Sequence, residues 1–291
     1  MSKLERFATN RPRLLGLAYR MLGEATEAED VLQDAYLRWE HSEAVEVPEA
    51  WLTKVVTNLC LNRLTSARAR RETYVGEWLP EPVVTGDGWL GPLETVEQRD
   101  SLSMGMLMLL ERLTPPERAA FVLREAFGHS HREVADILDV DESNARQLYH
   151  RARGHVGEPR KRFTVSPDES RRIMERFLAA ATAGDVAGLE RMLAEDVVNW
   201  ADGGGKAAAS VRPVYGRAKV ARLLAGLLSG PRGVGLEFAI GSLNGEPAVL
   251  TSLGGTLQSV TFVETGPDGM VTAIRSVANP DKLVHAASRL V

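Results

Sequence analysis

The residue types and spacing best suited to a chemical role lie in the segment 142–156. If this segment forms a helix, Ala145, Leu148 and Ala152 share one side. The opposite side carries polar and basic side chains: Ser143, Arg146, His150 and Arg153, with Gln147 beside them. The apolar side can pack closely on a neighbouring helix, and the polar side offers groups that bond base edges and phosphates in a DNA major groove. A solvated face on an ordinary helical hairpin would show the same pattern, so both interpretations stay open.

A second candidate surface for nucleic acid runs along the segment 51–71. It begins with Trp51, carries polar Lys54 and Asn58 on the side expected to be exposed, and ends in a basic tail with Arg63, Arg68, Arg70 and Arg71. An aromatic ring that stacks on bases, together with cations that neutralise the backbone, is typical of single-stranded DNA binding. The alternative is that Trp51 belongs to the core and the arginines are solvated.

The segment 29–34 has the opposite charge. Glu29, Asp30, Gln33 and Asp34 cannot attract DNA, but they could bind a basic protein surface. A solvated helix face is the common alternative for such a charge run, and the sequence of this segment alone does not exclude it.

Two short motifs near the C-terminal end combine acidic and basic residues. Their sequences are Asp202-Gly203-Gly204-Gly205-Lys206 and Asn279-Pro280-Asp281-Lys282-Leu283. The glycines allow close approach of the backbone, and the charged residues could line a pocket as ligand-binding or acid–base groups. The simpler interpretation is a glycine turn and a helix cap before a helix over 283–290. We expect no catalysis from either motif, and a docking role stays open.

Composition excludes several classes of protein. Hydrophobic residues make up 44% of the chain and charged residues 25%, as in ordinary globular proteins. The longest apolar runs, such as 107–110, are far shorter than the roughly 20 residues of a membrane span, and no signal peptide is evident. Cys60 is the single cysteine, so an internal disulfide or a multi-cysteine zinc site cannot form. We expect a cytoplasmic protein without metal, cofactor or membrane partner.

The net charge of −4 hides an uneven distribution. The segment 76–111 carries 7 acidic residues and one basic residue, whereas 112–162 carries 10 basic and 8 acidic residues. Whole-chain charge is therefore a poor guide to nucleic-acid binding, and the local arginine clusters matter more.

The elements that must position these residues begin with a helical domain over 1–75. Three helices share an apolar side there, and the pattern Thr26-x-x-Glu29 predicts a capping box at the start of the second. An acidic, Pro- and Gly-rich linker follows over 76–101.

A second helical domain is predicted over 102–160. It contains an apolar helix over 102–113 and three capped helices that follow Thr114, Ser130 and Asp141. The last two helices are joined by a short turn, as in a helix-turn-helix.

Residues 166–291 change to an α+β pattern. Helices come first, and alternating strands follow, with a tight hairpin turn at Asn244-Gly245 and a helix over 215–229 between strands. The fold class is therefore mostly α: two small helical domains and then an α+β domain with a mostly antiparallel sheet.

Together these segments resemble bacterial sigma factors of the extracytoplasmic-function group. Four motifs are similar to region two of that family: 18–23, 28–35, 51–53 and 66–72. Two are similar to region four: 113–118 and 145–153. The subgroup with a SnoaL-like, cone-shaped α+β C-terminal domain is the most similar. It carries a Trp-Leu-Pro-Glu-Pro linker motif, here 78–82, and the motifs at 202–206 and 279–283.

This resemblance implies promoter recognition in transcription initiation, with no enzymatic activity in the chain itself. The helix around Asp30, Gln33 and Asp34 would bind the clamp helices of the beta-prime subunit of core RNA polymerase, and region four would meet the beta flap. The segment 51–71 would hold the −10 strand. The −35 duplex would be read by Ser143, Asn144, Arg146, Gln147, His150 and Arg153. The C-terminal domain would regulate activity through intramolecular contacts, and whether it binds a small ligand stays open.

The sequence departs from the family at two places. Asn62-Arg63-Leu64-Thr65 stands where members often have Asp-Arg-Leu-Arg, which leaves one positive charge fewer near the −10 contact. Asp139 replaces a glycine that is common in the helix-turn-helix turn, and aspartate tolerates the left-handed conformation there.

Two other functions fit parts of the sequence. A helix-turn-helix regulator with a ligand-sensing C-terminal domain would need no polymerase contact. An enzyme related to SnoaL-like polyketide cyclases would need an acid–base pair such as Asp202 and a second group.

Overall fold

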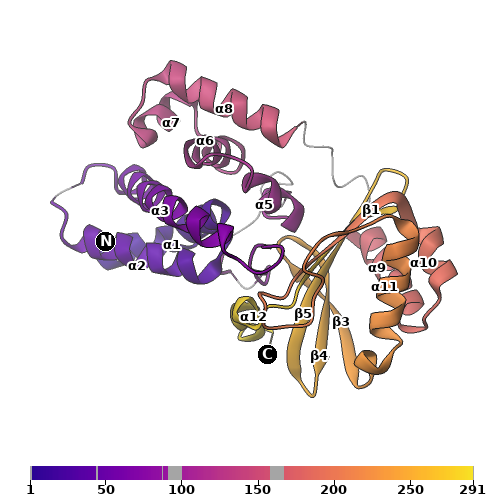
Figure 1. Ribbon diagram of the computed structural model, residues 1–291. Helices are drawn as coiled ribbons and strands as arrows, with labels where there is room; N and C mark the ends of the chain where they lie inside the picture. The colour runs from indigo at the N-terminus through magenta and orange to yellow at the C-terminus, as the bar shows by residue number, and fades with distance from the viewer. Residues whose placement is uncertain (1, 44, 87, 91–99, 158–166, 291) are drawn as a thin grey trace. The chain divides into compact units, whose positions relative to one another are not determined.

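The computed structural model describes residues 2–43, 45–86, 88–90, 100–157 and 167–290 (Figure 1). They form two compact units. The first consists of the described residues of 1–73 and 85–159, and the second of 74–84 and the described residues of 160–291. Among the described helices, none is both long enough and apolar enough to span a membrane.

Three helices form the first part of unit one: α1 (Lys3–Leu22), α2 (Ala25–Glu40) and α3 (Pro48–Glu72). Their shared core includes Leu15 and Tyr19, whose side chains are completely buried. The predicted capping box at Thr26 is wrong: Glu24 is the N-cap and makes no side-chain cap bond. Gly23 ends α1 in the left-handed conformation at φ 73°, so α2 begins within two residues and Thr26 falls inside its first turn.

Four helices form the second part of unit one: α5 (Met104–Leu110), α6 (Pro115–Glu125), α7 (His131–Leu138) and α8 (Glu142–Val156). The helix expected over 102–113 is shorter, because Ser103 caps its start and the N–H groups of Arg112 and Leu113 bond carbonyls only three residues back. Capping boxes at Thr114 and Ser130 are present, as predicted.

The turn between α7 and α8 confirms the expectation for Asp139. This residue adopts φ 57° and ψ 47°, the left-handed conformation. Asp141 then caps α8 by accepting a hydrogen bond from the N–H of Asn144. Ala145, Leu148 and Ala152 are buried on the side of α8 that faces its neighbours, so the helix-turn-helix presents its other side outward.

Unit two is built on a six-stranded sheet in the order β2-β1-β6-β5-β4-β3. The strands are β1 (Leu193–Asp202), β2 (Val214–Tyr215), β3 (Leu236–Leu243), β4 (Glu246–Leu253), β5 (Thr256–Thr265) and β6 (Val271–Val277). Only β1 and β6 pair in parallel; the other neighbours pair antiparallel, so the predicted α+β class is confirmed. Asn244 and Gly245, both at positive φ, form the tight β3–β4 turn.

Helices cover one face of this sheet (Figure 1). They are α9 (Pro167–Thr182), α10 (Val186–Met192) and α11 (Arg217–Leu228), and a short 3-10 turn, η1 (Pro231–Gly233), follows them. Phe177, Leu189 and Leu224 of these helices pack with Val197 and Ile274 of the sheet in one buried cluster. The last helix, α12 (Pro280–Ala287), follows β6.

The segment 74–84 belongs to unit two, although the sequence predicts a linker from residue 76 onward. Val84 pairs with Leu243 at the end of β3. The N–H of Val83 donates to the Asn244 side chain, and the carbonyl of Val83 accepts from the Asn244 N–H. Segment 74–84 therefore lies against the β3–β4 hairpin of unit two.

Candidate DNA, polymerase and regulatory sites

The outward side of α8 carries the residues predicted to read the −35 duplex. Ser143, Arg146, Gln147, His150 and Arg153 are exposed, and Asn144 is half-buried. Arg146 forms an ion pair with Glu142 one turn earlier, but its side chain is still 65% exposed. An exposed pair of this kind is weak, so it does little to hold the Arg146 side chain in one place.

The described side chains among the residues predicted for −10 binding do not form one free surface on α3. Trp51 is half-buried, and its ring lies 5.6 Å from that of Trp39. The ammonium of Lys54 donates to the carbonyl of Asp136 in α7, at 2.8 Å. Asn58 is exposed, whereas Arg63 forms ion pairs with α2. The side chains at 68, 70 and 71 lie outside the described residues.

The outer side of α2 carries the residues predicted to bind core polymerase. Asp30 and Gln33 are exposed, and Asp34 is half-buried. Leu37 follows on the same side and is 52% exposed, although it is a large apolar residue. Leu37 is not among the predicted residues, although its position four residues after Gln33 places it on this face.

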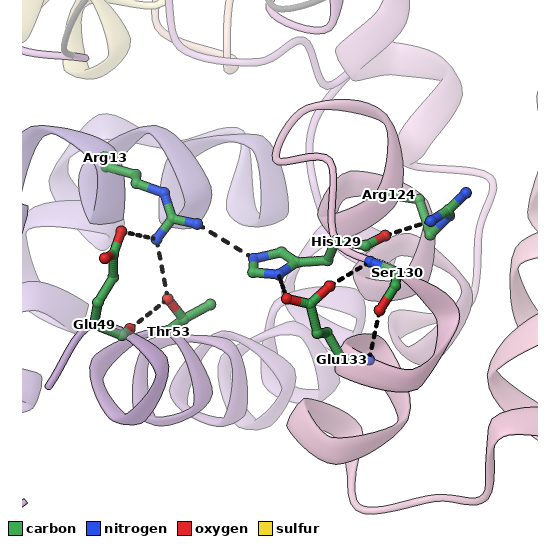
Figure 2. A network of polar contacts seen from close by, with 7 residues as sticks. All are labelled: Arg13, Glu49, Thr53, Arg124, His129, Ser130 and Glu133. Atoms are coloured by element: carbon green, nitrogen blue, oxygen red, sulfur yellow. Dashed lines mark hydrogen bonds and ion pairs between the residues drawn. The ribbon is translucent and has the colours of Figure 1, made fainter. Parts of the chain in front are cut away.

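A polar network joins the two parts of unit one (Figure 2). Arg13 of α1 lies 3.3 Å from Nε2 of His129 and also contacts Glu49 and Thr53 of α3. Because a guanidinium can only donate, Nε2 of His129 must be unprotonated to accept this bond. The other ring nitrogen lies 3.9 Å from Glu133. Burial, and then the charge of Arg13, lower the pKa of His129, which fits a neutral ring.

Two buried arginines make further contacts between the two parts of unit one. Arg118 donates to the backbone carbonyl of Met21 at 2.7 Å and pairs with Glu111, and Arg20 donates to Ser101 at 2.8 Å. Burial lowers the pKa of each guanidinium to about 9. Sequence patterns do not predict these two contacts, because Arg20 and Ser101 are 81 residues apart in the chain and Arg118 and Met21 are 97 residues apart.

Asp202 lies at the centre of the two C-terminal motifs, 202–206 and 279–283, in unit two. Its side chain is completely buried and accepts four hydrogen bonds. The donors are the hydroxyl of Tyr74 at 2.6 Å, the N–H of Leu79 at 2.9 Å, the N–H of Gly204 at 3.1 Å and the ammonium of Lys282 at 2.7 Å. Two of these donors belong to segment 74–84, so Asp202 holds that segment directly.

The second motif completes this site. Lys282 also donates to the carbonyl of Leu79, and its ammonium lies 4.2 Å from the ring centroid of Trp78. Asn279 caps α12 and donates to the hydroxyl of Tyr74 at 2.8 Å. Burial, and then the hydrogen bond to Asp202, raise the pKa of the Tyr74 phenol. The two motifs therefore meet and together bind segment 74–84.

The remaining members of the motifs have simpler positions. Lys206 and Asp281 form an exposed ion pair at 2.5 Å. Gly203 and Leu283 are buried, and Gly205 and Pro280 are exposed. Gly204 has φ 57° and lies directly against the Asn279 amide. Within the described part of the chain, no group of three or more His, Cys, Asp or Glu side chains is arranged to hold a metal ion.

Family models match both helical parts of the chain. Residues 6–70 match Sigma-70 region 2, and residues 103–156 match Sigma-70, region 4. The first match covers α1–α3, and the second covers the helix-turn-helix with the helices before it.

Similar proteins extend the match to the whole chain. The ECF RNA polymerase sigma factor SigJ of Mycobacterium tuberculosis is 39% identical over 96% of this chain and 93% of its own length. The probable ECF RNA polymerase sigma factor SigI of the same species is 33% identical over 63% of this chain and 64% of its own length. A crystal structure of Mycobacterium tuberculosis SigJ covers 99% of this chain and 100% of that chain, with a TM-score of 0.77 and 36% identity. The chain therefore belongs to the extracytoplasmic-function sigma factors, the non-enzymatic subunits that direct RNA polymerase to promoters.

Proposed function

We propose that the outward side of α8 reads the −35 element of the promoter. The observation that supports this most directly is the division of α8 into two sides. Small apolar residues are buried on one side, and Arg146, Gln147, His150 and Arg153 are exposed on the other. A helix-turn-helix places such a side in the major groove, where arginine and glutamine can bond base edges.

For the −10 element, α3 supplies the contacts in this proposal. Asn58 is exposed, and Trp51 and Lys54 lie on the same helix. The carbonyl of Asp136 holds the Lys54 ammonium, and Arg13 binds the neighbouring His129. Full access of DNA to Lys54 therefore requires α7 to move away from α3. The free protein is closed at this surface and opens when it binds polymerase and promoter.

For core polymerase, α2 supplies the docking surface. Asp30, Gln33 and Asp34 offer acceptors to basic side chains of the beta-prime clamp helices, and exposed Leu37 adds an apolar contact. Region four contacts the beta flap. Removal of an exposed apolar side chain from water on binding favours association.

The C-terminal domain regulates these activities through segment 74–84. This segment joins region two to region four in the chain, and Asp202, Asn279 and Lys282 bind it within unit two. A change in those contacts alters how far segment 74–84 can move, and with it the link between the two DNA-binding parts. Any ligand of the C-terminal domain would act through the same connection.

Run-off transcription with purified bacterial core polymerase tests this function. The template is the upstream region of the gene's own operon, with nonspecific DNA as the control. The full chain should give a specific transcript. Asp30→Arg should abolish it at the step of polymerase binding, and Arg146→Ala should weaken it at the step of promoter binding. If the full chain binds DNA but not polymerase, the proposed polymerase docking is wrong.

The regulatory role needs a separate comparison. Lys206 and Asp281 are exposed, so Asp281→Lys should leave the fold intact while it replaces their attraction with repulsion. Transcription by this variant and by Asp202→Asn should differ from that of the unaltered chain. Unchanged transcription in both variants would contradict control by the C-terminal domain.

A further inference from the structure

Arg63 lies among carboxylates rather than on a free basic surface. Its Nη1 lies 2.6 Å from Glu27 and 3.5 Å from Asp30, and its Nη2 lies 3.0 Å from Asp34. Only 26% of the Arg63 side chain is exposed. To bind a DNA phosphate, the guanidinium would have to leave these ion pairs, so its geometry does not favour a −10 contact.

The three acidic partners of Arg63 form a stripe on α2. Positions 27, 30 and 34 follow one another at helical spacing, and like charges at that spacing repel each other. A guanidinium is planar and donates from several nitrogens at once, so it can hold carboxylates from successive turns together. Partial burial lowers the pKa of Arg63, but hydrogen bonds with Glu27 and Asp34 raise it overall.

The three carboxylates differ in exposure. Glu27 is the inner member, with 22% of its side chain exposed, whereas Asp30 is 56% exposed and Asp34 is 47% exposed. Each carboxylate has more acceptor sites than Arg63 occupies. The two outer residues can therefore accept a second cation from outside while Arg63 holds them from within.

From this arrangement we infer that Arg63 is a positioning residue of the polymerase-binding surface. It fixes Asp30 and Asp34 in the arrangement that receives basic side chains of core polymerase, and it does not read the −10 strand. This inference rests on the proposed docking role of α2.

The direction in which Arg63→Ala changes polymerase affinity distinguishes a positioning role from simple charge attraction. Arg63→Ala removes a positive charge from an acidic surface. If only the net charge mattered, a basic partner would bind this variant more tightly. If Arg63 positions the acids, the variant binds more weakly in spite of its greater negative charge. If Arg63 contacts only DNA, polymerase affinity does not change.

The experiment titrates labelled full-length chain with core polymerase in the absence of DNA and measures fluorescence anisotropy. Arg63→Ala should weaken binding about 5- to 10-fold, the size of the coupling expected within a shared ion-pair network. Arg63→Lys keeps the charge without the planar geometry and should restore part of the loss. Arg6→Ala, at an exposed arginine of α1, is the matched control and should bind normally. Unchanged or tighter binding by Arg63→Ala overturns the inference.

Glu27→Gln provides a second route if Arg63→Ala does not fold. It weakens the shortest ion pair of Arg63 and leaves Asp30 and Asp34 in place. The double variant Glu27→Gln/Arg63→Lys should lose less binding free energy than the sum of the losses in the two single variants. A loss equal to that sum contradicts the shared network. At saturating polymerase, Arg63→Lys should keep the −10 sequence preference of the unaltered chain; a changed preference assigns Arg63 to DNA instead.

Failure of this inference can be distinguished from failure of the proposed docking role. If Asp30→Arg binds core polymerase normally, α2 is not the docking surface. If Asp30→Arg binds weakly while the Arg63 and Glu27 variants bind normally, docking stands and only the positioning role is wrong.

Discussion

The ammonium of Lys282 lies 2.7 Å from the carboxylate of Asp202, and both side chains are at least nine-tenths buried. Both groups also bind the backbone of Leu79: Asp202 accepts from its N–H, and Lys282 donates to its carbonyl. One residue of segment 74–84 is therefore held by both members of a buried ion pair. Breaking the pair affects the attachment of this segment together with the fold of unit two.

Asp202→Asn tests this coupling. The substitution preserves shape but leaves the buried ammonium of Lys282 without a counter-charge, so we expect a loss of about 3–5 kcal/mol in unfolding free energy. Urea unfolding followed by tryptophan fluorescence measures this loss, because Trp78 lies beside Lys282.

Asp281→Asn is the matched control for that loss. It breaks only the exposed pair with Lys206, whose contribution should be about 0–1 kcal/mol. Equal losses in the two variants would mean that burial of the Asp202–Lys282 pair does not determine its effect.

The parts of this site that the sequence predicts are those fixed by local interactions. The glycine turn at 202–206 and the cap at Asn279 follow from residue type alone, because each forms within a few residues. Segment 74–84 has no helical or strand period, and its partners lie more than 100 residues away in the chain. Local sequence patterns therefore predict only a linker from residue 76 onward, with the motif at 78–82 known only from its resemblance to a subgroup of sigma factors.

The same distinction holds in unit one. The capping boxes at Thr114 and Ser130 and both sides of α8 are predictable, since they depend on neighbours in one helix. The partners of Lys54 and Arg63 are not, because each lies on another helix. Helical spacing indicates which way a side chain points, but tertiary packing decides what it meets there.

The second prediction concerns base reading by α8. Arg146→Ala should cost about 1–3 kcal/mol of promoter affinity and relax specificity at one position of the −35 element. Binding of holoenzyme to a set of promoters with single base changes in the −35 element measures both effects.

Arg151→Ala is the matched control for Arg146→Ala. It removes the same charge from the same helix, but Arg151 lies toward Glu117 rather than on the outward side. An even loss of affinity across all promoters in Arg146→Ala would assign Arg146 to a phosphate contact.

The third prediction is a pH dependence that arises from His129. Its pKa in the folded chain lies below its ordinary value of 6.5, because of burial and then Arg13, although Glu133 and Glu49 oppose the shift. As the pH falls below that ordinary value, the unfolded chain gains a proton that the folded chain does not. The stability that His129 contributes is therefore fully present above about pH 6.5. It decreases as the pH falls from there to the pKa of His129 in the folded chain.

His129→Gln isolates this contribution. Its amide oxygen can still accept from Arg13 but does not titrate. Melting temperatures measured from about pH 7.5 to about pH 5.5 should fall more for the unaltered chain than for the variant. Parallel curves would show that His129 does not couple protonation to the packing of α6 and α7 on α1 and α3.

The fourth prediction separates two costs at Gly204. This residue has φ 57°, and a Cβ atom there would come within 2.3 Å of the Asn279 amide nitrogen. Gly254 has nearly the same φ, 55°, but no atom lies within 4 Å of its added Cβ. Gly254→Ala should therefore lose only the unfolding free energy that the left-handed conformation costs an alanine, about 1–2 kcal/mol.

Gly204→Ala should lose more unfolding free energy in the same urea measurement, because Asn279 must also release Tyr74 or move away from α12. Adding Asn279→Ala to Gly204→Ala should then remove part of the excess, since the clashing amide is gone. If the two glycine variants lose the same free energy, the close contact between the two motifs does not contribute to holding segment 74–84.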